Sequence, residues 1–115
     1  MFKKDMKYSL LLDFYGDLLS ERKKELIELY YNEDLSLSEV SEITGISRQG
    51  VRDSVKKAET ELEDYEAKLG MAKRFEDIQT KLEKAIVDLH KIAEKSGEND
   101  AEIYSVADFL SKINL

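Results

Sequence analysis

The sequence predicts an all-α protein, in which a helix-turn-helix domain is followed by a C-terminal helical extension. Three observations support this prediction. Apolar residues recur at intervals of three and four residues, no strand-like alternation of apolar and polar residues is present, and the chain has no proline and only five glycines. The segment Ser36–Lys57 also contains the start, turn and restart signals of two short consecutive helices.

The N-terminal part of the chain predicts two amphipathic helices. Within residues 7–19 the apolar side chains are spaced as on one face of a helix, and Ser20 is a suitable N-cap for a second helix that ends near Tyr31. Asn32 and the two acidic residues after it then interrupt the helical pattern. We expect an aromatic cluster to pack these helices onto the rest of the domain: Phe14, Tyr15, Tyr30 and Tyr31.

The helix-turn-helix is predicted by local signals on both sides of Gly45. Ser36 can cap the first helix in a capping box with Glu39, and Ser47 can cap the second. Gly45 lies where the chain reverses and where one residue needs a positive φ. The following residues are expected where the two helices cross: Val40, Ile43, Ile46, Val51 and Val55.

The second helix of the motif is predicted to continue well beyond the length that reads DNA. Its apolar residues follow steps of four and three, a heptad pattern, until Gly70 gives a stop signal, so the helix should span residues 47–69. This seam can either pair two chains or pack within one chain. Its members are Val51, Val55, Ala58, Leu62, Tyr65 and Leu69.

Two further helices are predicted after Gly70, over residues 71–94 and 101–112, with a loop at residues 96–100 in which Gly97 caps the preceding helix. The domain organisation is therefore a helix-turn-helix domain over residues 1–69 and a helical extension over residues 70–115. An apolar stripe follows the first of these helices through Phe75, Ile78, Leu82, Ile86, Leu89 and Ile92.

Several classes of function are disfavoured by composition. The chain has no cysteine and a single histidine, His90, so a zinc site, a thiol nucleophile or a Ser-His-Asp triad is not expected. We expect neither an enzyme nor a cofactor. No apolar run reaches the length of a membrane span, and acidic residues interrupt the apolar N-terminal segment, so we expect a cytoplasmic protein without a membrane span.

Charge is distributed unevenly along this acidic chain. The formal net charge is −7, yet Ser36–Lys57 alone carries +1 and the remainder −8. The cations of that segment are Arg48, Arg52, Lys56 and Lys57, and all of them lie on the predicted second helix of the motif. A general affinity for nucleic acid is therefore not expected, whereas a local cationic surface is.

These residues resemble a known family. The blocks LLDFYGDLLS, LYYNEDLSLSEVSE, SRQGVRD and LEDYEAKL, in this order, are similar to the YlxM-like family of helix-turn-helix proteins. The resemblance covers about residues 10–69 and fades after Gly70. Gly50 and Ser41 stand where alanine is commoner in the family, and Arg52 where tyrosine often stands.

The resemblance implies a fold similar to the sigma-factor domain that reads the upstream promoter element. It also implies an association with the signal recognition particle pathway, because the family is encoded beside the particle's GTPase and its receptor. Ser47, Arg48, Gln49, Val51 and Asp53 match the family's recognition-helix block.

Two functions remain open at the level of sequence. The favoured one is a non-enzymatic regulator that binds a protein or RNA of the signal recognition particle. There the acidic end of the long helix would attract a basic partner through Glu61, Glu63, Asp64 and Glu66. The alternative is a sequence-specific regulator of transcription that binds double-stranded DNA through Ser47, Arg48, Gln49, Arg52, Lys56 and Lys57. A homodimer is also expected, because the apolar seams on the two long helices offer ways to dimerise, and a dimer would double the cations available to phosphate.

Overall fold

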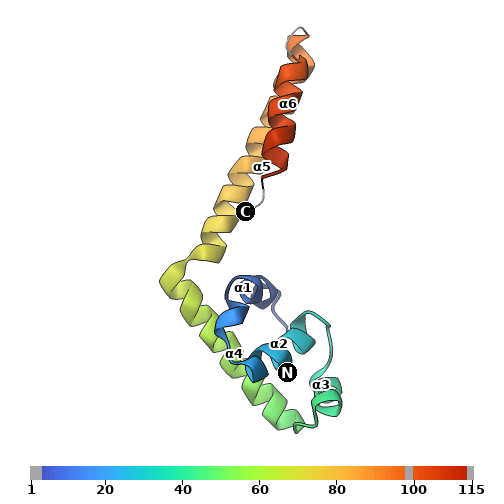
Figure 1. Cartoon of the computed structure of the whole chain (residues 1–115), viewed down its shortest axis with the longest axis vertical. Helices are drawn as coiled ribbons and strands as arrows, with labels where there is room; N and C mark the ends of the chain where they lie inside the picture. Colours follow the sequence, from blue (N-terminus) through green and yellow to red (C-terminus); the bar gives the residue numbers. More distant parts are fainter. Residues whose placement is uncertain (1–3, 98–99, 114–115) are drawn as a thin grey trace. The chain divides into compact units, whose positions relative to one another are not determined.

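The computed structural model describes residues 4–97 and 100–113, and every regular element in them is a helix (Figure 1). The all-α prediction is therefore confirmed for this part of the chain. The chain divides between Ala72 and Lys73 into two compact units, the N-terminal unit and the C-terminal unit. The elements are α1 (Lys7–Tyr15), the 3-10 helix η1 (Gly16–Leu18), α2 (Glu21–Tyr31), α3 (Leu37–Thr44), α4 (Arg48–Leu69), α5 (Met71–Ser96) and α6 (Asp100–Ser111).

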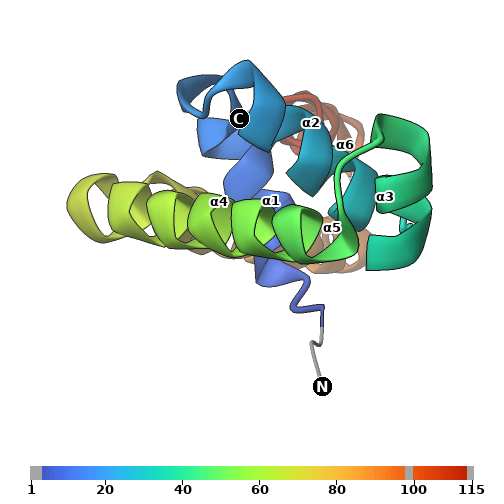
Figure 2. The ribbon, with the colours of Figure 1, turned by 90° about the horizontal axis from the view of Figure 1, so that it is seen from below.

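The N-terminal unit is built around α4, which contacts α1, α2 and α3 (Figure 2). Its core contains the expected aromatic residues: Tyr15, Tyr30 and Tyr31 are buried, and Phe14 packs against them from a half-buried position. The α4 seam completes this core, since Val51, Val55, Ala58 and Leu62 are buried within the unit. Over these four residues the seam packs within one chain rather than between two chains.

The first predicted helix ends earlier than expected. Residues 7–19 were predicted as one helix, but α1 ends at Tyr15 and the chain tightens into η1. A 3-10 turn rotates each residue further round the axis than an α-turn does, which changes the side chain that faces the core. Leu19 is therefore buried, whereas Leu18, which the periodic pattern placed on the apolar face of the helix, is exposed.

The predicted helix-turn-helix is present as α3, a turn at Gly45, and α4. The Ser36 Oγ accepts from the Glu39 amide at 3.0 Å, and the Ser36 amide donates to the Glu39 carboxylate at 3.0 Å, which is the expected capping box. Gly45 has a φ of +76°, in the left-handed region that favours glycine. The Ser47 cap of α4 is present as well.

The prediction that Ile43 lies between the crossing helices is wrong. Ile43 is 62% exposed, while Leu37 and Val40 are buried. Thr44 follows Val40 by four residues and takes the inward position of the last turn, where its hydroxyl donates to the Val40 carbonyl at 2.8 Å. Ile43, one residue earlier, is thereby turned about 100° away from that position.

The far end of α4 follows the predicted course. The helix runs to Leu69 and stops at Gly70, whose φ is +61°. Tyr65 packs against the core, but Leu69 at the end of the seam is largely exposed.

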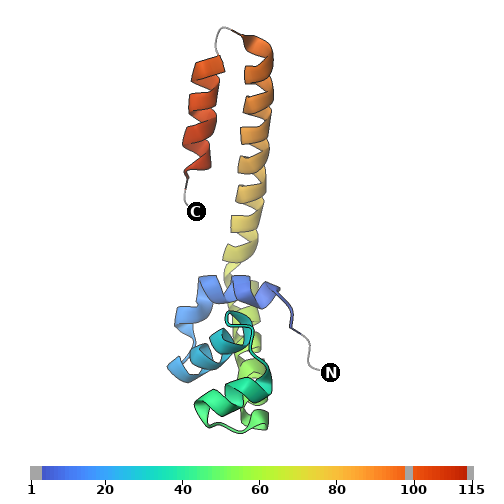
Figure 3. The ribbon, with the colours of Figure 1, turned by 90° about the vertical axis from the view of Figure 1, so that its right-hand side faces the viewer.

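The C-terminal unit consists of α6 and nearly all of α5, and α6 runs back alongside α5 (Figure 3). α5 extends two residues beyond its predicted end, and Gly97 has the positive φ expected of a helix cap. Residues 98–99 of the predicted loop lie outside the described residues. The boundary between functional domains at Gly70 stays a prediction.

Candidate nucleic-acid interface

The turn before α4 is held by side chains of the motif itself. The Ser41 hydroxyl donates to the Ile46 carbonyl, and the Ser47 Oγ accepts from the Gly50 amide at 3.0 Å. Gly45, with its left-handed backbone, lies within the loop that the Ser41–Ile46 bond closes. The start of α4 is therefore fixed by local contacts, as a binding helix requires if its first turn is to be pre-organised.

Gly50 makes a close internal approach. A Cβ atom placed on Gly50 would lie 2.9 Å from the Cγ2 atom of Ile46, which is closer than real side chains pack. The group that approaches Gly50 so closely is a side chain of the turn. Gly50 thus lets Ile46 pack against the first turn of α4.

The six residues predicted to bind nucleic acid lie together along the N-terminal half of α4 and its cap, and we call them the cationic patch. Five of them are exposed and Arg52 is half-buried. Val51 and Val55, on the same half of α4, face the core instead. The members are Ser47, Arg48, Gln49, Arg52, Lys56 and Lys57.

An amide–carboxylate pair modifies this surface. The Gln49 side-chain amide donates to the Asp53 carboxylate at 2.9 Å, one helical turn further along. This contact holds Gln49 along the helix surface, and the Asp53 charge opposes phosphate. This bond occupies one of the two N–H groups of the Gln49 amide, so reading adenine through Gln49 would use the other N–H group and require the side chain to turn towards the base.

A lysine of α2 lies beside the cationic patch and was not predicted. Lys23 lines a shallow hollow of about 340 Å³ with Lys56, Lys57 and Thr60, and its ammonium group also pairs with Glu61. Lys23 is more than thirty residues away from Lys56 in sequence, so no local pattern connects the two. Only the packing of α2 on α4 brings Lys23 to this surface.

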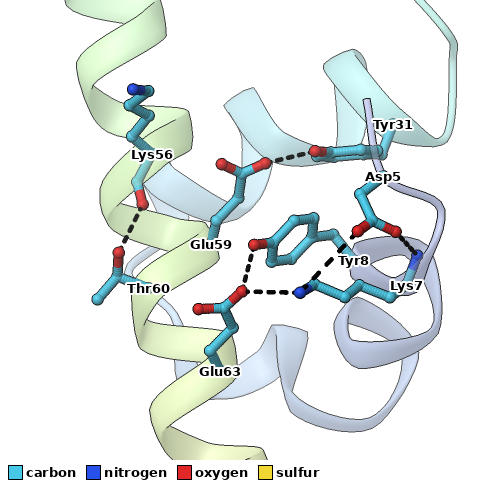
Figure 4. A network of polar contacts seen from close by, with 8 residues as sticks. All are labelled: Asp5, Lys7, Tyr8, Tyr31, Lys56, Glu59, Thr60 and Glu63. Atoms are coloured by element: carbon cyan, nitrogen blue, oxygen red, sulfur yellow. Dashed lines mark hydrogen bonds and ion pairs between the residues drawn. The ribbon is translucent and has the colours of Figure 1, made fainter. Parts of the chain in front are cut away.

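The C-terminal half of α4 is acidic, and tyrosines of α1 and α2 donate to its carboxylates. Tyr8 donates to Glu63, and Tyr31 donates to Glu59 (Figure 4). Lys7 also pairs with Glu63 at 3.2 Å. These contacts connect the long helix to α1 and α2 through polar groups as well as through the core.

The same contacts move the pKa values of the groups involved. Hydrogen bonds from Tyr8 and Lys7 lower the pKa of Glu63 because they favour its ionised form. For Glu59 the loss of hydration outweighs the Tyr31 hydrogen bond, so its pKa is raised. The pKa values of Tyr8 and Tyr31 are both raised. Burial is the largest cause, and the hydrogen bond to Glu63 or Glu59 is the next.

A third tyrosine holds the junction between α4 and α5. The buried Tyr15 hydroxyl donates to Glu66 at 2.6 Å and accepts from the Met71 amide at 3.1 Å. The Glu66 carboxylate in turn accepts from the Ala72 amide at 3.0 Å. Two amides at the start of α5 are therefore bonded to side chains of the N-terminal unit.

The residues predicted to bind a basic partner are thus largely used inside the N-terminal unit. Glu61 pairs with Lys23, Glu63 bonds Tyr8 and Lys7, and Glu66 bonds Tyr15. Asp64, the fourth of them, is exposed. Tyr15 and Tyr31 were predicted as core residues and Tyr8 was given no role, and no pattern in the sequence indicated that their hydroxyl groups reach carboxylates of α4.

The described residues offer neither a metal site nor a membrane-spanning helix. No group of histidine, aspartate and glutamate side chains in residues 4–97 and 100–113 is arranged to hold a metal ion. His90 instead packs edge-to-face on Tyr104, with ring centres 5.3 Å apart. None of the described helices combines the length and the apolar character needed to cross a membrane.

Comparison with known proteins agrees with this fold. A family model described as "Putative helix-turn-helix protein, YlxM / p13 like" matches residues 2–103. A UPF0122 protein of Thermoanaerobacter sp. (strain X514) is 44% identical over 104 residues, which are 90% of this chain and 87% of the relative. A UPF0122 protein of Caldanaerobacter subterraneus subsp. tengcongensis is 53% identical over 76 residues, 66% and 65% of the two chains. One of Clostridium novyi (strain NT) is 38% identical over 95 residues, 83% of each chain.

Proposed function

Because the chain belongs to the UPF0122 family of YlxM/p13-like helix-turn-helix proteins, we propose that it is a non-enzymatic regulatory protein that binds nucleic acid through the cationic patch. The observation that supports this most is the division of charge along α4. Three of the four cations of its N-terminal half are exposed and Arg52 is half-buried, whereas most carboxylates of its C-terminal half are bonded within the unit. The cytoplasmic location expected from the sequence stays a prediction.

The magnitude of the charge favours binding to the nucleic-acid backbone. Arg48, Arg52, Lys56 and Lys57 can neutralise at most about four phosphates, which gives weak and strongly salt-dependent binding. Arginine can also bond guanine bidentately, so some base readout through Arg48 or Arg52 is within the chemistry of the surface. The Gln49–Asp53 bond opposes a further base contact.

The proposed setting is the signal recognition particle pathway, which the family resemblance implied, and the particle RNA and a duplex operator are the two ligands to compare. A chain with a net charge of −7 and one local cationic surface suits a single defined ligand better than a general one. Docking of a basic protein on Glu61, Glu63, Asp64 and Glu66, which the sequence favoured, becomes the alternative hypothesis. It requires carboxylates that already accept intramolecular hydrogen bonds.

The experiment measures the affinity of the full chain for a labelled duplex and for a labelled structured RNA as salt is varied. The variant Lys56→Gln/Lys57→Gln should weaken binding and reduce the slope of log K against log salt by about one unit per lost phosphate contact. Lys68→Gln is the control for loss of a cation from α4, because Lys68 is also exposed on this helix but lies eleven residues beyond Lys57. It should leave the slope unchanged.

The acidic side supplies the opposing test. Under the proposal, Glu61→Gln/Asp64→Asn leaves nucleic-acid affinity unchanged or raises it slightly by removing repulsion. Equal salt slopes for the wild type and Lys56→Gln/Lys57→Gln would show that the lysines of the cationic patch do not contact the nucleic acid. Slowed association with a basic protein of the particle on loss of these carboxylates would favour the alternative.

We also propose that the working form is a homodimer, because a second cationic patch would double the phosphates that one assembly can neutralise. The buried part of the α4 seam is occupied within the N-terminal unit, so this dimer must use other surfaces.

A further inference from the structure

The C-terminal unit lacks a core of its own. Among its described residues only Ala93 and Ala107 are buried. The larger apolar side chains between α5 and α6, such as Leu82 and Leu110, are half-buried and line an open hollow of about 360 Å³. A helical hairpin of about 40 residues seldom buries enough apolar surface to be stable alone. This unit therefore needs a covering surface.

The apolar side chains that need covering form one row along each helix. On α5 the row repeats every seven residues, and on α6 it follows steps of three and four, so each row lies along one line of its helix. Most of these side chains are strongly exposed for their type, and Phe109 reaches 70%. Together they form what we call the apolar face: Ile78, Ala85 and Ile92 on α5, with Val106, Phe109 and Ile113 on α6.

The His90–Tyr104 contact shows that both rows lie on the same side of the hairpin. These two rings touch across α5 and α6 and so mark one side of the unit. At 100° per residue, every member of the α5 row lies roughly 120–160° round the helix from His90. At the same 100° per residue, every member of the α6 row lies roughly 140–180° round the helix from Tyr104. Both rows therefore belong to the side opposite the ring pair.

The same contact fixes the levels of the two helices. Because α6 runs antiparallel to α5, counting five residues back from His90 and five forward from Tyr104 reaches the same level, at Ala85 and Phe109. The α5 row is symmetric about Ala85, with Ile78 and Ile92 seven residues to either side. The α6 row is centred near Phe109. One level is thus the midpoint of both rows.

We propose that a second copy of this chain covers the apolar face, related by a two-fold axis at the level of Ala85 and Phe109. Such an axis places Ile78 against Ile92 of the partner subunit and Phe109 against the partner's Phe109. Two hairpins then form an antiparallel four-helix bundle, a common solution for amphipathic helix pairs. The self-complementary rows favour a second copy over a foreign partner, because one axis satisfies both helices at once.

Charge agrees with this arrangement at the centre of the face. Lys81 and Asp88 lie on one edge of the α5 row, four residues before and three after Ala85. The two-fold axis sets each of them beside the opposite charge of the partner subunit. Arg74 and Lys95 occupy the outer positions of the same edge and repel across the pair, so the helices should diverge at their ends, as crossing helices do.

The size of the face is adequate for a stable pair. Its five large apolar residues and the adjoining half-buried ones expose roughly 500 Å² per copy, since an aromatic side chain alone can bury 150–250 Å². Two copies would then bury about 1,000 Å² of apolar surface, near the lower bound for specific interfaces. The expected pair is therefore a reversible dimer.

This inference specifies the surface of the homodimer proposed above and rests on that dimer, but not on nucleic-acid binding. Its test is the mass of the full chain in sedimentation equilibrium across the micromolar range, without nucleic acid. Ile92→Glu should raise the dissociation constant of the dimer by about tenfold or more. Val87→Glu is the matched control, because Val87 is equally exposed at 51% against 52% but lies on the other side of α5. It should leave the constant unchanged.

Disulfide cross-linking tests the direction of the pairing with small changes to the fold. The chain has no native cysteine. An equimolar mixture of Ile78→Cys and Ile92→Cys chains should cross-link as a mixed dimer, and neither chain should do so alone, since a disulfide needs Cα atoms within about 7 Å. Val87→Cys should stay uncross-linked.

Three results would overturn the proposal. The first is a monomeric wild type throughout the concentration range, and the second is an equal response of the dimer to Ile92→Glu and Val87→Glu. The third is cross-linking of Ile78→Cys with itself, which would replace the antiparallel pair by a parallel one. A dimer that fails to bind nucleic acid would contradict the proposed function alone.

Discussion

At the scale of single residues, the packing of Gly50 against Ile46 decides how the turn is joined to α4. Gly50→Ala should gain up to about 1 kcal/mol in helix propensity. However, the new Cβ would meet the Ile46 Cγ2 atom at 2.9 Å, and crowding of this kind costs about 1–3 kcal/mol. We therefore expect Gly50→Ala to lower the free energy of unfolding in urea titrations.

The control removes the methyl group that causes the crowding. Leucine has no Cγ2 branch, so in an Ile46→Leu background only the Ser47 Oγ at 3.1 Å still crowds the new Cβ, and the same Gly50→Ala change should be clearly less destabilising. A Gly50→Ala variant that is more stable than the wild type would show that Ile46 moves aside without cost.

The local signals of the sequence were reliable at this scale where a single backbone position decides the outcome. Gly45 needed a positive φ, and Ser36 and Ser47 needed an extended backbone before a helix, and all three are as predicted. Ile43 failed because periodicity alone does not say whether the residue three or four positions after Val40 faces inward. The Thr44 hydroxyl bond to the Val40 carbonyl accompanies the inward position of Thr44.

At the scale of elements, α4 combines a solvent-facing cationic half with an acidic half that is bonded to tyrosines. Periodicity predicted the limits of this helix, because apolar steps and a terminal glycine are properties of the helix itself. The partners of Glu59, Glu63 and Glu66 could not be predicted in the same way. Tyr8 is 55 residues from Glu63 in sequence, and only the packing of α1 on α4 brings them together.

These tyrosines should make the protein sensitive to alkaline pH. The pKa values of Tyr8, Tyr15 and Tyr31 are raised above the ordinary value of 10.0, with burial as the largest cause. Unfolded tyrosines ionise near that value while the folded ones stay protonated, so this stability is complete below pH 10 and falls as the pH rises further. The urea midpoint should be lower at pH 11 than at pH 8.

Tyr31→Phe separates this effect from the titration of lysines. The variant should be less stable at pH 8, because Glu59 loses a donor in a half-buried position. Its further loss between pH 8 and pH 11 should be smaller than that of the wild type, since phenylalanine does not ionise. Equal losses in the two proteins would assign the alkaline effect to other groups.

At the scale of the whole molecule, the two units differ in how they are stabilised. The N-terminal unit has a continuous core, whereas the described part of the C-terminal unit buries only two alanines. We therefore expect two thermal transitions. Because a dimer gains stability with concentration, the transition of the C-terminal unit should rise in temperature as protein is added, and that of the N-terminal unit should not.

The variants already described provide the check on this prediction. Ile92→Glu should remove the concentration dependence, and Val87→Glu should preserve it. A C-terminal transition at the same temperature over a hundredfold range of wild-type concentration would mean that the hairpin is stable without a partner. The sequence predicted both helices here, but apolar periodicity does not show how much of each helix its neighbour covers, and several large apolar side chains of the pair are exposed.

The side-chain bonds at the start of α5 have a consequence for amide hydrogen exchange. The first amides of a helix have no acceptor within it and ordinarily exchange fast with solvent. Here Met71 donates to the Tyr15 hydroxyl and Ala72 to Glu66, and Tyr15 lies in the core. Their exchange should therefore require opening of the N-terminal unit, at rates close to those of buried α4 amides. Tyr15→Phe should speed the exchange of the Met71 amide and leave the Ala72 amide protected by Glu66. The exchange rates of these two amides therefore report separately on the Tyr15 and the Glu66 hydrogen bonds.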